Sequence, residues 1–297
     1  MAATTLLRLF DEHWNGWRRG VETCRESLRR ATVHDLRVNS RRLLSFLELS
    51  RGIIPVPRKA DERATAAVES LLDTLGPLRD AQNQRNRAMR TRPGPGVEPL
   101  RRHLKQRESR FARRARHGLG DADRARVRKA VTRLRKAVAA HRAAGGPAER
   151  RLRLAKVVDL AAADVRNRLA RLDLDKPRTA HRLRLALKRF RYTVEIATRL
   201  SSTLDIDGQP TVRALQRRLG RAHDAEVLVD RLDRFVRRHP GDDGPGLAAF
   251  RQTIDAERAR QFAGLTRALT PLRRMLTGVA ARATSRPRTV IEGTSKG

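Results

Sequence analysis

Two segments of the sequence carry histidine and basic residues at the same spacing. The shared pattern is His-x-x-Arg-x-x-x-basic-Arg, and its members are His34, Arg37, Arg41 and Arg42 in the first segment and His181, Arg184, Lys188 and Arg189 in the second. A guanidinium group stays charged and holds phosphate through two parallel hydrogen bonds. An imidazole donates hydrogen bonds and gains a positive charge as the pH falls. These residue types therefore favour binding of a phosphate-rich anion, with the histidines adding affinity at acid to neutral pH.

Helical geometry places the first set on one face of a helix. With about 100° per residue, Arg37 and Arg41 lie within about 60° of His34. Glu48 shares this stripe, whereas Leu43 lies on the opposite side in an apolar stripe. Because an apolar stripe of this kind faces a bundle core, the basic stripe faces outward or toward the other half of the molecule.

The second set repeats the arrangement of the first. The offset is 147 positions, from His34 to His181, and the same offset relates Glu48 to Glu195. Each glutamate is an acidic residue on a basic stripe. We expect both to orient the neighbouring arginines by ion pairing rather than to touch an anion.

Two further landmarks recur in the same order. Leu75–Ala81 matches Leu219–Ala225 at an offset of 144, and the Pro-Gly loops that begin at Pro93 and Pro240 are again 147 positions apart. Three ordered matches indicate an internal duplication. Two copies of one basic stripe, facing each other across a pseudo-dyad, suit a long and symmetric anionic ligand.

The pattern along the chain is helical. Ala, Leu, Arg and Glu recur at spacings of three and four, strand signals are nearly absent, and proline and glycine divide the chain. The helices are expected at about 3–30, 32–51, 59–91, 97–143 (interrupted at 118–120), 148–172, 177–203, 209–237 and 246–282. We predict an all-α fold of two pseudo-symmetric antiparallel four-helix bundles. The first is assigned to residues 1–145 and the second to 146–282, followed by a disordered tail at 283–297.

The net charge limits the classes of partner. In 297 residues, 67 Lys and Arg stand against 32 Asp and Glu, which gives a formal charge of +35. Such self-repulsion calls for a polyanion such as nucleic acid, an anionic membrane or another polyphosphate, although a GC-rich genome also raises the arginine content.

The single cysteine, Cys24, excludes a disulfide framework within one chain. With neither an apolar span nor an export signal, a cytoplasmic protein is expected.

Several other functions are alternatives to the binding of a phosphate-rich anion. Non-specific nucleic-acid binding fits the charge, but aromatic residues for base stacking are scarce, at 3%. His34 or His181 could accept a phosphoryl group in a phosphorelay. A third alternative is a scaffold that docks on acidic proteins. His223 beside Asp224 is taken as a packing or capping arrangement, and no metal-ligand spacing or nucleophile constellation is found.

The paired motifs resemble the CHAD domain (conserved histidine α-helical domain) family. The second copy continues as Arg191-Tyr192-Thr193-Val194-Glu195, which is similar to the family's Arg-Tyr-x-x-Glu, whereas Leu44 replaces the arginine in the first copy. The resemblance runs from about residue 5 to 282 and implies an all-α fold that binds inorganic polyphosphate, often on polyphosphate granules. Many relatives also carry a CYTH-type triphosphatase domain. No segment here matches one, so we expect a standalone binding module.

Together these observations predict a polyphosphate-binding protein that is not an enzyme. The proposed polyphosphate-binding residues are His34, Arg37, Arg41, Arg42, His181, Arg184, Lys188, Arg189 and Arg191, with Glu48, Tyr192 and Glu195 in support. No cofactor or metal is expected. The expected partners are inorganic polyphosphate, granule-associated proteins and, non-specifically, nucleic acid, with no membrane.

Overall fold

The computed structural model describes residues 2–140, 146–201, 209–242 and 244–284. Within these ranges the regular secondary structure is α-helix without strands, which confirms the predicted all-α class. The helices are α1 (Ala2–Glu26), α2 (Arg30–Ile53), α3 (Arg58–Met89), α4 (Val97–Gly118), α5 (Asp121–Ala140), α6 (Pro147–Ala170), α7 (Pro177–Leu200), α8 (Gln209–Arg238) and α9 (Pro245–Thr284). No helix in the described ranges has the length and apolar character needed to cross a membrane.

The ends of the two predicted domains lie partly outside the described residues. The predicted boundary at 145/146 adjoins residues 141–145, which are not described. Of the predicted tail at 283–297, residues 283–284 form the end of α9 and the remainder is not described.

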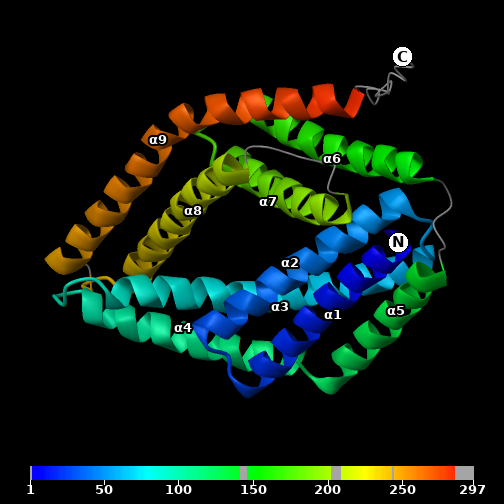
Figure 1. The fold of residues 1–297 in the computed structure, drawn as a ribbon. Coiled ribbons are helices and arrows are strands. Elements are labelled where there is room, and N and C mark those ends of the chain that lie inside the picture. Colours follow the sequence, from blue (N-terminus) through cyan, green and yellow to red (C-terminus); the bar gives the residue numbers. More distant parts are fainter. Residues whose placement is uncertain (1, 141–145, 202–208, 243, 285–297) are drawn as a thin grey trace, which may run out of the picture.

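Glycine and proline determine several helix boundaries. The predicted interruption at 118–120 separates α4 from α5. A Cβ on Gly118 would lie 2.7 Å from Cγ2 of Thr74, so the close packing of this turn on α3 requires glycine. Pro177 begins α7, where its missing N–H would have no helical partner. Pro271 lies inside α9, where it cannot donate the helical hydrogen bond. Figure 1 shows that this helix bends along its length.

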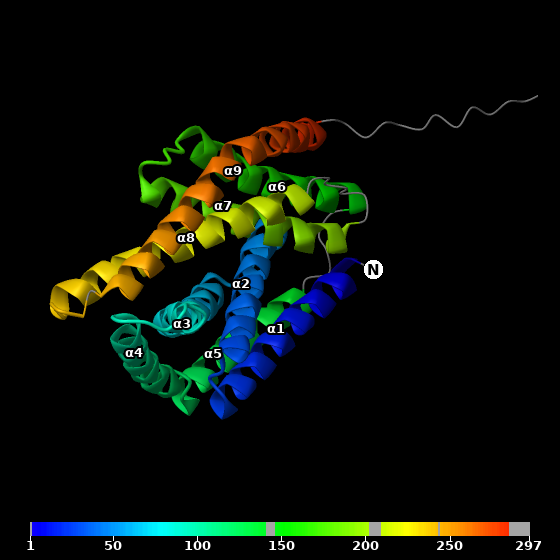
Figure 2. The ribbon, with the colours of Figure 1, turned by 90° about the vertical axis from the view of Figure 1, so that its left-hand side faces the viewer.

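The helices of the two halves of the chain pack in the same order. In the first half α1 contacts α2 and α5, α2 contacts α3, and α3 contacts both α4 and α5. In the second half α6 contacts α7 and α9, α7 contacts α8, and α8 contacts α9. Across the halves α2 contacts α6 and α7, and α3 contacts α8. Figures 1 and 2 show α8 and α9 lying over α3 and α4, with α2 running up to α6 and α7.

The buried apolar residues do not divide into one core for each half. A large cluster joins α1, α2, α3 and α5 to α6, α7, α8 and the second part of α9. A smaller cluster joins the end of α3 and the start of α4 to α8 and α9, through residues such as Leu104, Leu232 and Phe250. The division into two separate bundles by duplication therefore stays a prediction, since the interior is shared.

The two Pro-Gly loops singled out in the sequence pack against each other. Gly96 has a φ of 81°, and a Cβ there would lie 2.7 Å from the carbonyl oxygen of Asp242. A Cβ on Gly244 would lie 2.9 Å from Cβ of Pro95. Glycine is therefore required on both sides of this contact, which joins the α3–α4 turn to the α8–α9 turn.

Candidate functional site

Four cations from α2 and α7 come together where the two halves meet. We call them the central cluster: Arg37 and Arg41 from α2, and Arg184 and Lys188 from α7. Their charges repel one another: Arg41 and Arg184 lower the pKa of Arg37, and all three arginines lower the pKa of Lys188. The two basic stripes thus converge, one from each half.

Partial burial makes the charge in this cluster costly. It lowers the pKa of Lys188 to about 6, with Arg184 adding the next largest effect. It also lowers the pKa of Arg37 to about 10. At neutral pH Lys188 is therefore largely uncharged in the free protein. An anion brought into the cluster would favour the protonated amine.

The central cations are positioned without being neutralised. Nη1 of Arg37 donates a hydrogen bond of 2.6 Å to the carbonyl oxygen of Leu72 on α3. The guanidinium passes over Gly76, where a Cβ would be in ordinary van der Waals contact with the same nitrogen, at 3.5 Å. Nε of Arg184 is buried with no hydrogen-bond partner among the described residues. Within the described ranges none of the four forms an ion pair.

Two aspartates face the central cluster: Asp80, to which the sequence analysis gave no role, and Asp224, which it took as part of a packing or capping arrangement with His223. Partial burial raises the pKa of Asp80 on α3, and Arg37 opposes this shift. The same holds for Asp224 on α8, where Arg184 provides the opposing charge. Both side chains remain accessible to water. They occupy matching positions in the repeated segments Leu75–Ala81 and Leu219–Ala225, and this match was the signal that could have identified them.

The motif histidines lie at the edges of the cluster. His34 is exposed, and the packed part of its ring, followed by the charge of Arg79, lowers its pKa. His181 is half-buried, with its ring centroid 4.7 Å from that of His223. Burial lowers the pKa of His181 and brings that of His223 to about 4. All three imidazoles thus gain charge at a lower pH than a free imidazole, because burial and then the neighbouring cations disfavour protonation.

Arg42 and Arg189 lie beside the cluster but are bound by carboxylates. Nη2 of Arg42 lies 3.2 Å from Oε1 of Glu195, and Nε of Arg189 donates a hydrogen bond of 2.8 Å to Oε2 of Glu48. The two ion pairs are reciprocal, since each joins α2 to α7 at matching positions. Arg42 and Arg189 each come one position after a residue of the basic stripe, so their side chains project about 100° away from it, toward the facing helix. Both arginines therefore lie in contacts between the helices, and their predicted contact with phosphate stays a prediction.

Arg191 and Tyr192 support the edge of the site. The guanidinium carbon of Arg191 lies 4.4 Å from the ring centroid of Tyr192, and Nη1 lies 3.9 Å from Oε2 of Glu195. Tyr192 is buried. Burial lowers the pKa of Arg41, and the nearby Tyr192 partly opposes this shift, so a residue of the second copy lies close to an arginine of the first.

A cavity of about 930 Å³ opens beside the central cluster. Its lining comes from α2, α3, α8 and α9 and includes Arg30, Arg79, Arg87, Arg90, Arg221 and Asp224. Arg79 is fixed there by a hydrogen bond of 3.0 Å from Nη1 to the carbonyl oxygen of Arg30. Asp224 borders both the cavity and the cluster, so the cationic surface continues from one to the other. The sequence analysis did not single out these arginines, since nothing distinguished them from the many others.

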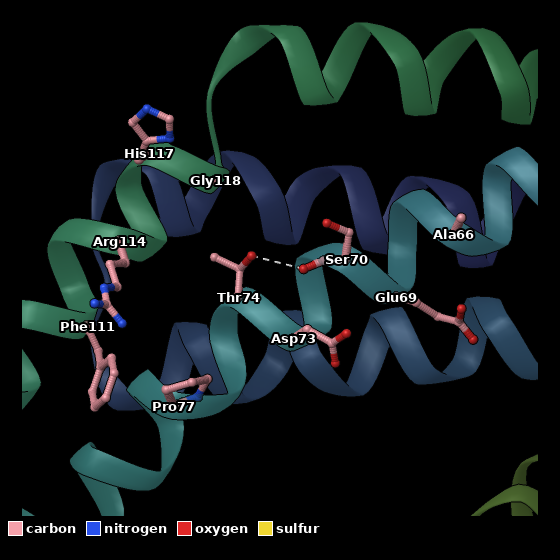
Figure 3. A pocket seen from close by; sticks show the side chains of 10 residues that line it. All are labelled: Ala66, Glu69, Ser70, Asp73, Thr74, Pro77, Phe111, Arg114, His117 and Gly118. Atoms are coloured by element: carbon pink, nitrogen blue, oxygen red, sulfur yellow. Dashed lines mark hydrogen bonds between the residues drawn. The ribbon is translucent and has the colours of Figure 1, made fainter.

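A second pocket, of about 740 Å³, lies between α3 and α4 and is drawn in Figure 3. Glu69 and Asp73 on α3 lie across from Arg114 on α4. Thr74 Oγ1 donates a hydrogen bond of 2.9 Å to the carbonyl oxygen of Ser70 and so faces its own helix. Two carboxylates on one wall make this pocket unfavourable for a polyanion.

Comparison with known proteins agrees with this architecture. The CHAD domain family matches residues 2–205 and 208–292, and the chain belongs to this family. No curated protein matches the sequence. The crystal structure of the CHAD domain from the plant Ricinus communis is similar at 21% identity and a TM-score of 0.63, covering 95% of this chain and 92% of that one. PptA from Streptomyces chartreusis is similar at 16% identity and a TM-score of 0.65, covering 93% and 99%. These similarities establish the fold.

Proposed function

We propose that the protein binds inorganic polyphosphate, with the chain lying along the central cluster and the adjoining cavity. The observation that carries this proposal is the meeting of four cations that have no ion-pair partner within the described ranges. Each has a lowered pKa, so the charged form of each is destabilised in the free site and would be stabilised by an anion. A polymer with one negative charge per phosphate could contact α2 and α7 together. Family membership adds support, because the CHAD resemblance implies this ligand.

We propose further that the site is formed by two related halves. The matching order of helix contacts and the reciprocal ion pairs Arg42–Glu195 and Arg189–Glu48 support this view. The halves are not equal in detail. Arg79 lies beside His34 where His223 lies beside His181, so one end of the site is more basic.

The proposal is for binding without a chemical step. A polyphosphate-storing protein of this kind is expected in the cytoplasm, on polyphosphate granules with other granule-associated proteins. Release of orthophosphate from polyphosphate by the purified protein would contradict the first statement. A fluorescent fusion that stays diffuse in cells with abundant granules would contradict the second.

The binding site is tested by removing two central charges. Arg41 and Arg184 form no hydrogen bond or ion pair among the described residues, so R41Q/R184Q relieves repulsion without breaking a contact. The matched control is R267Q/R274Q, which removes the same charge from exposed positions on α9. We expect the first pair to weaken polyphosphate binding at least a hundredfold, at about tenfold for each lost charged contact. The control should change it less than threefold.

Two outcomes would overturn this assignment. Equal losses in R41Q/R184Q and the control would mean that only bulk charge matters. Displacement of polyphosphate by duplex DNA at equal phosphate concentration and physiological salt would favour nucleic acid instead. Separately, a stable phosphohistidine at His34 or His181 after incubation with a phosphodonor would support the phosphorelay alternative. Circular dichroism and thermal unfolding of each variant verify that the fold is retained.

A further inference from the structure

A second group of arginines gathers between α4 and α8, away from the two motif helices. We call it the tip cluster: Arg107 and Arg110 from α4, and Arg231 and Arg234 from α8. Partial burial lowers the pKa of Arg107 to about 10, and Arg231 adds the next largest effect. The pKa of Arg231 is lowered by burial and then by Arg234. These arginines repel one another across the gap between two helices that are distant in sequence.

Two members of the tip cluster lack anionic partners. Nε of Arg107 and Nε of Arg231 are both buried with no hydrogen-bond partner among the described residues. Of the nearby carboxylates, Glu108 lies 2.9 Å from Nη1 of Arg85, outside the cluster. Asp230 lies 3.7 Å from Nη2 of Arg234, a member of the cluster, and its charge opposes the lowering of the pKa of Arg231. An unneutralised pair of guanidinium groups on rigid helices is suited to a bidentate anion.

The surroundings hold these arginines in place. The guanidinium carbon of Arg107 lies 5.0 Å from the ring centroid of Phe111, within the range of a cation–π contact. Beneath the cluster, Leu104, Leu232 and Phe235 belong to the small apolar core that joins α4 and α8. The arginines are therefore presented on a packed base, and little side-chain freedom is left to lose when an anion binds.

The matching positions in the other half are neutralised. At the offset of 144, Arg231 corresponds to Arg87, and Arg87 forms an ion pair with Glu257. At the offset of 147, Glu257 itself corresponds to Arg110. One end of the site thus carries an internal counter-ion where the other end carries an additional arginine. This difference singles out the tip cluster among the many arginines of the chain.

The tip cluster is connected to the central cluster through Asp80. The charge of this carboxylate opposes the burial-driven lowering of the pKa of both Arg37 and Arg107, so it lies near both groups. We propose that Arg107 and Arg231 form a second phosphate-binding subsite, which takes up the polyphosphate chain where it leaves the central cluster toward α4 and α8. The inference rests on the proposed function, since it extends the same ligand to a new set of residues.

The test compares R107Q/R231Q with R113Q/R116Q. Arg113 and Arg116 are exposed and lie on the other face of α4, so the control changes the net charge equally. Binding of long-chain polyphosphate should fall about tenfold to a hundredfold in R107Q/R231Q. The slope of log K against log salt should become shallower by about 1.4, at about 0.7 for each lost contact. Tripolyphosphate, which is short enough for the central cluster alone, should bind as before, and R107K/R231K should keep the salt slope.

The possible outcomes separate the subsite from the proposed function. An unchanged salt slope in R107Q/R231Q, or an equal change in R113Q/R116Q, would overturn the subsite. An equal loss for tripolyphosphate would also overturn it, because the arginines would then act on the central cluster. If R41Q/R184Q leaves both ligands bound normally, the proposed function itself fails. Thermal unfolding verifies that R107Q/R231Q is folded. If tripolyphosphate binds too weakly to be compared, the salt slope for long-chain polyphosphate still distinguishes the presence of the subsite from its absence.

Discussion

Lys188 provides a direct test of how the central cluster responds to an anion. Its pKa of about 6 in the free protein leaves roughly a tenth of the amine protonated at pH 7. Burial and then repulsion from Arg184, Arg41 and Arg37 lower this pKa, and phosphates beside the amine would raise it by favouring the protonated form. Binding at pH 7 should therefore take up nearly one proton at this residue, and affinity should rise as the pH falls.

The size of the effect follows from linkage. Between pH 8 and pH 7 the bound amine stays protonated while the free amine stays neutral, so affinity should increase nearly tenfold, at about 1.4 kcal/mol for each pH unit. Between pH 7 and pH 6 the increase should be smaller, because the free amine begins to protonate. Other groups at the site also titrate, namely His34, His181, His223, Asp80 and Asp224.

Two variants isolate the contribution of Lys188. K188M should bind more weakly than the wild type at pH 8 and gain much less affinity on acidification, since it cannot take up the proton. K188R should bind more tightly than the wild type at pH 8 and depend less on pH. Fluorescence anisotropy with labelled polyphosphate at constant ionic strength measures affinity, and calorimetry in buffers of different ionisation enthalpy counts protons. If K188M keeps the pH dependence and the proton uptake of the wild type, the reasoning is refuted.

Further predictions concern the fold that holds the site, each measured by urea unfolding. G96A should lower the free energy of unfolding by about 1–3 kcal/mol, since φ is 81° at this position. G220A lies inside α8, where a Cβ would meet no neighbouring atom, and should raise the free energy of unfolding by up to about 1 kcal/mol. A G96A variant as stable as the wild type would contradict the account of the loop contact. A double-mutant cycle on Arg42 and Glu195 should give a coupling of about 0.5–1 kcal/mol because both side chains are partly exposed, and zero coupling would remove their role in joining the halves. Burial lowers the pKa of His223 to about 4 in the folded protein, below its value in the unfolded chain, so the free energy of unfolding should fall as the pH drops from 6.5 toward 4. H223Q should lose this pH dependence. If NMR shows that the His223 ring titrates near pH 6.5 in the folded protein, this prediction is wrong.

The fold class could be read from the sequence because helix periodicity and Pro/Gly punctuation are local signals. The interruption at 118–120 and the start of α7 at Pro177 follow from residues at the boundary itself. The sharing of the interior could not be predicted in this way. An apolar stripe on α2 indicates that some surface covers it, but not that α6 and α7 contribute to the cover.

The site was predictable where one helix carried the pattern and not where contacts cross between helices. The stripe of Arg37 and Arg41 follows from spacing alone. The ion pair of Arg42 with Glu195 depends on which helix lies opposite, so the sequence could not distinguish Arg42 from Arg41. Asp80 and the tip cluster were missed for the same reason, since single aspartates and arginines gain their role from neighbours contributed by other helices.

The shared interior has a consequence for how the chain can be divided. A fragment ending near residue 140 would leave the α2 surface that contacts α6 and α7 open to water, and the apolar side of α3 that meets α8 would be uncovered as well. Although the two halves share sequence motifs, we expect neither half to form a stable fold alone. Because the interior is shared, we expect the two parts to fold as one cooperative unit, and the proposed anion-binding surface requires both.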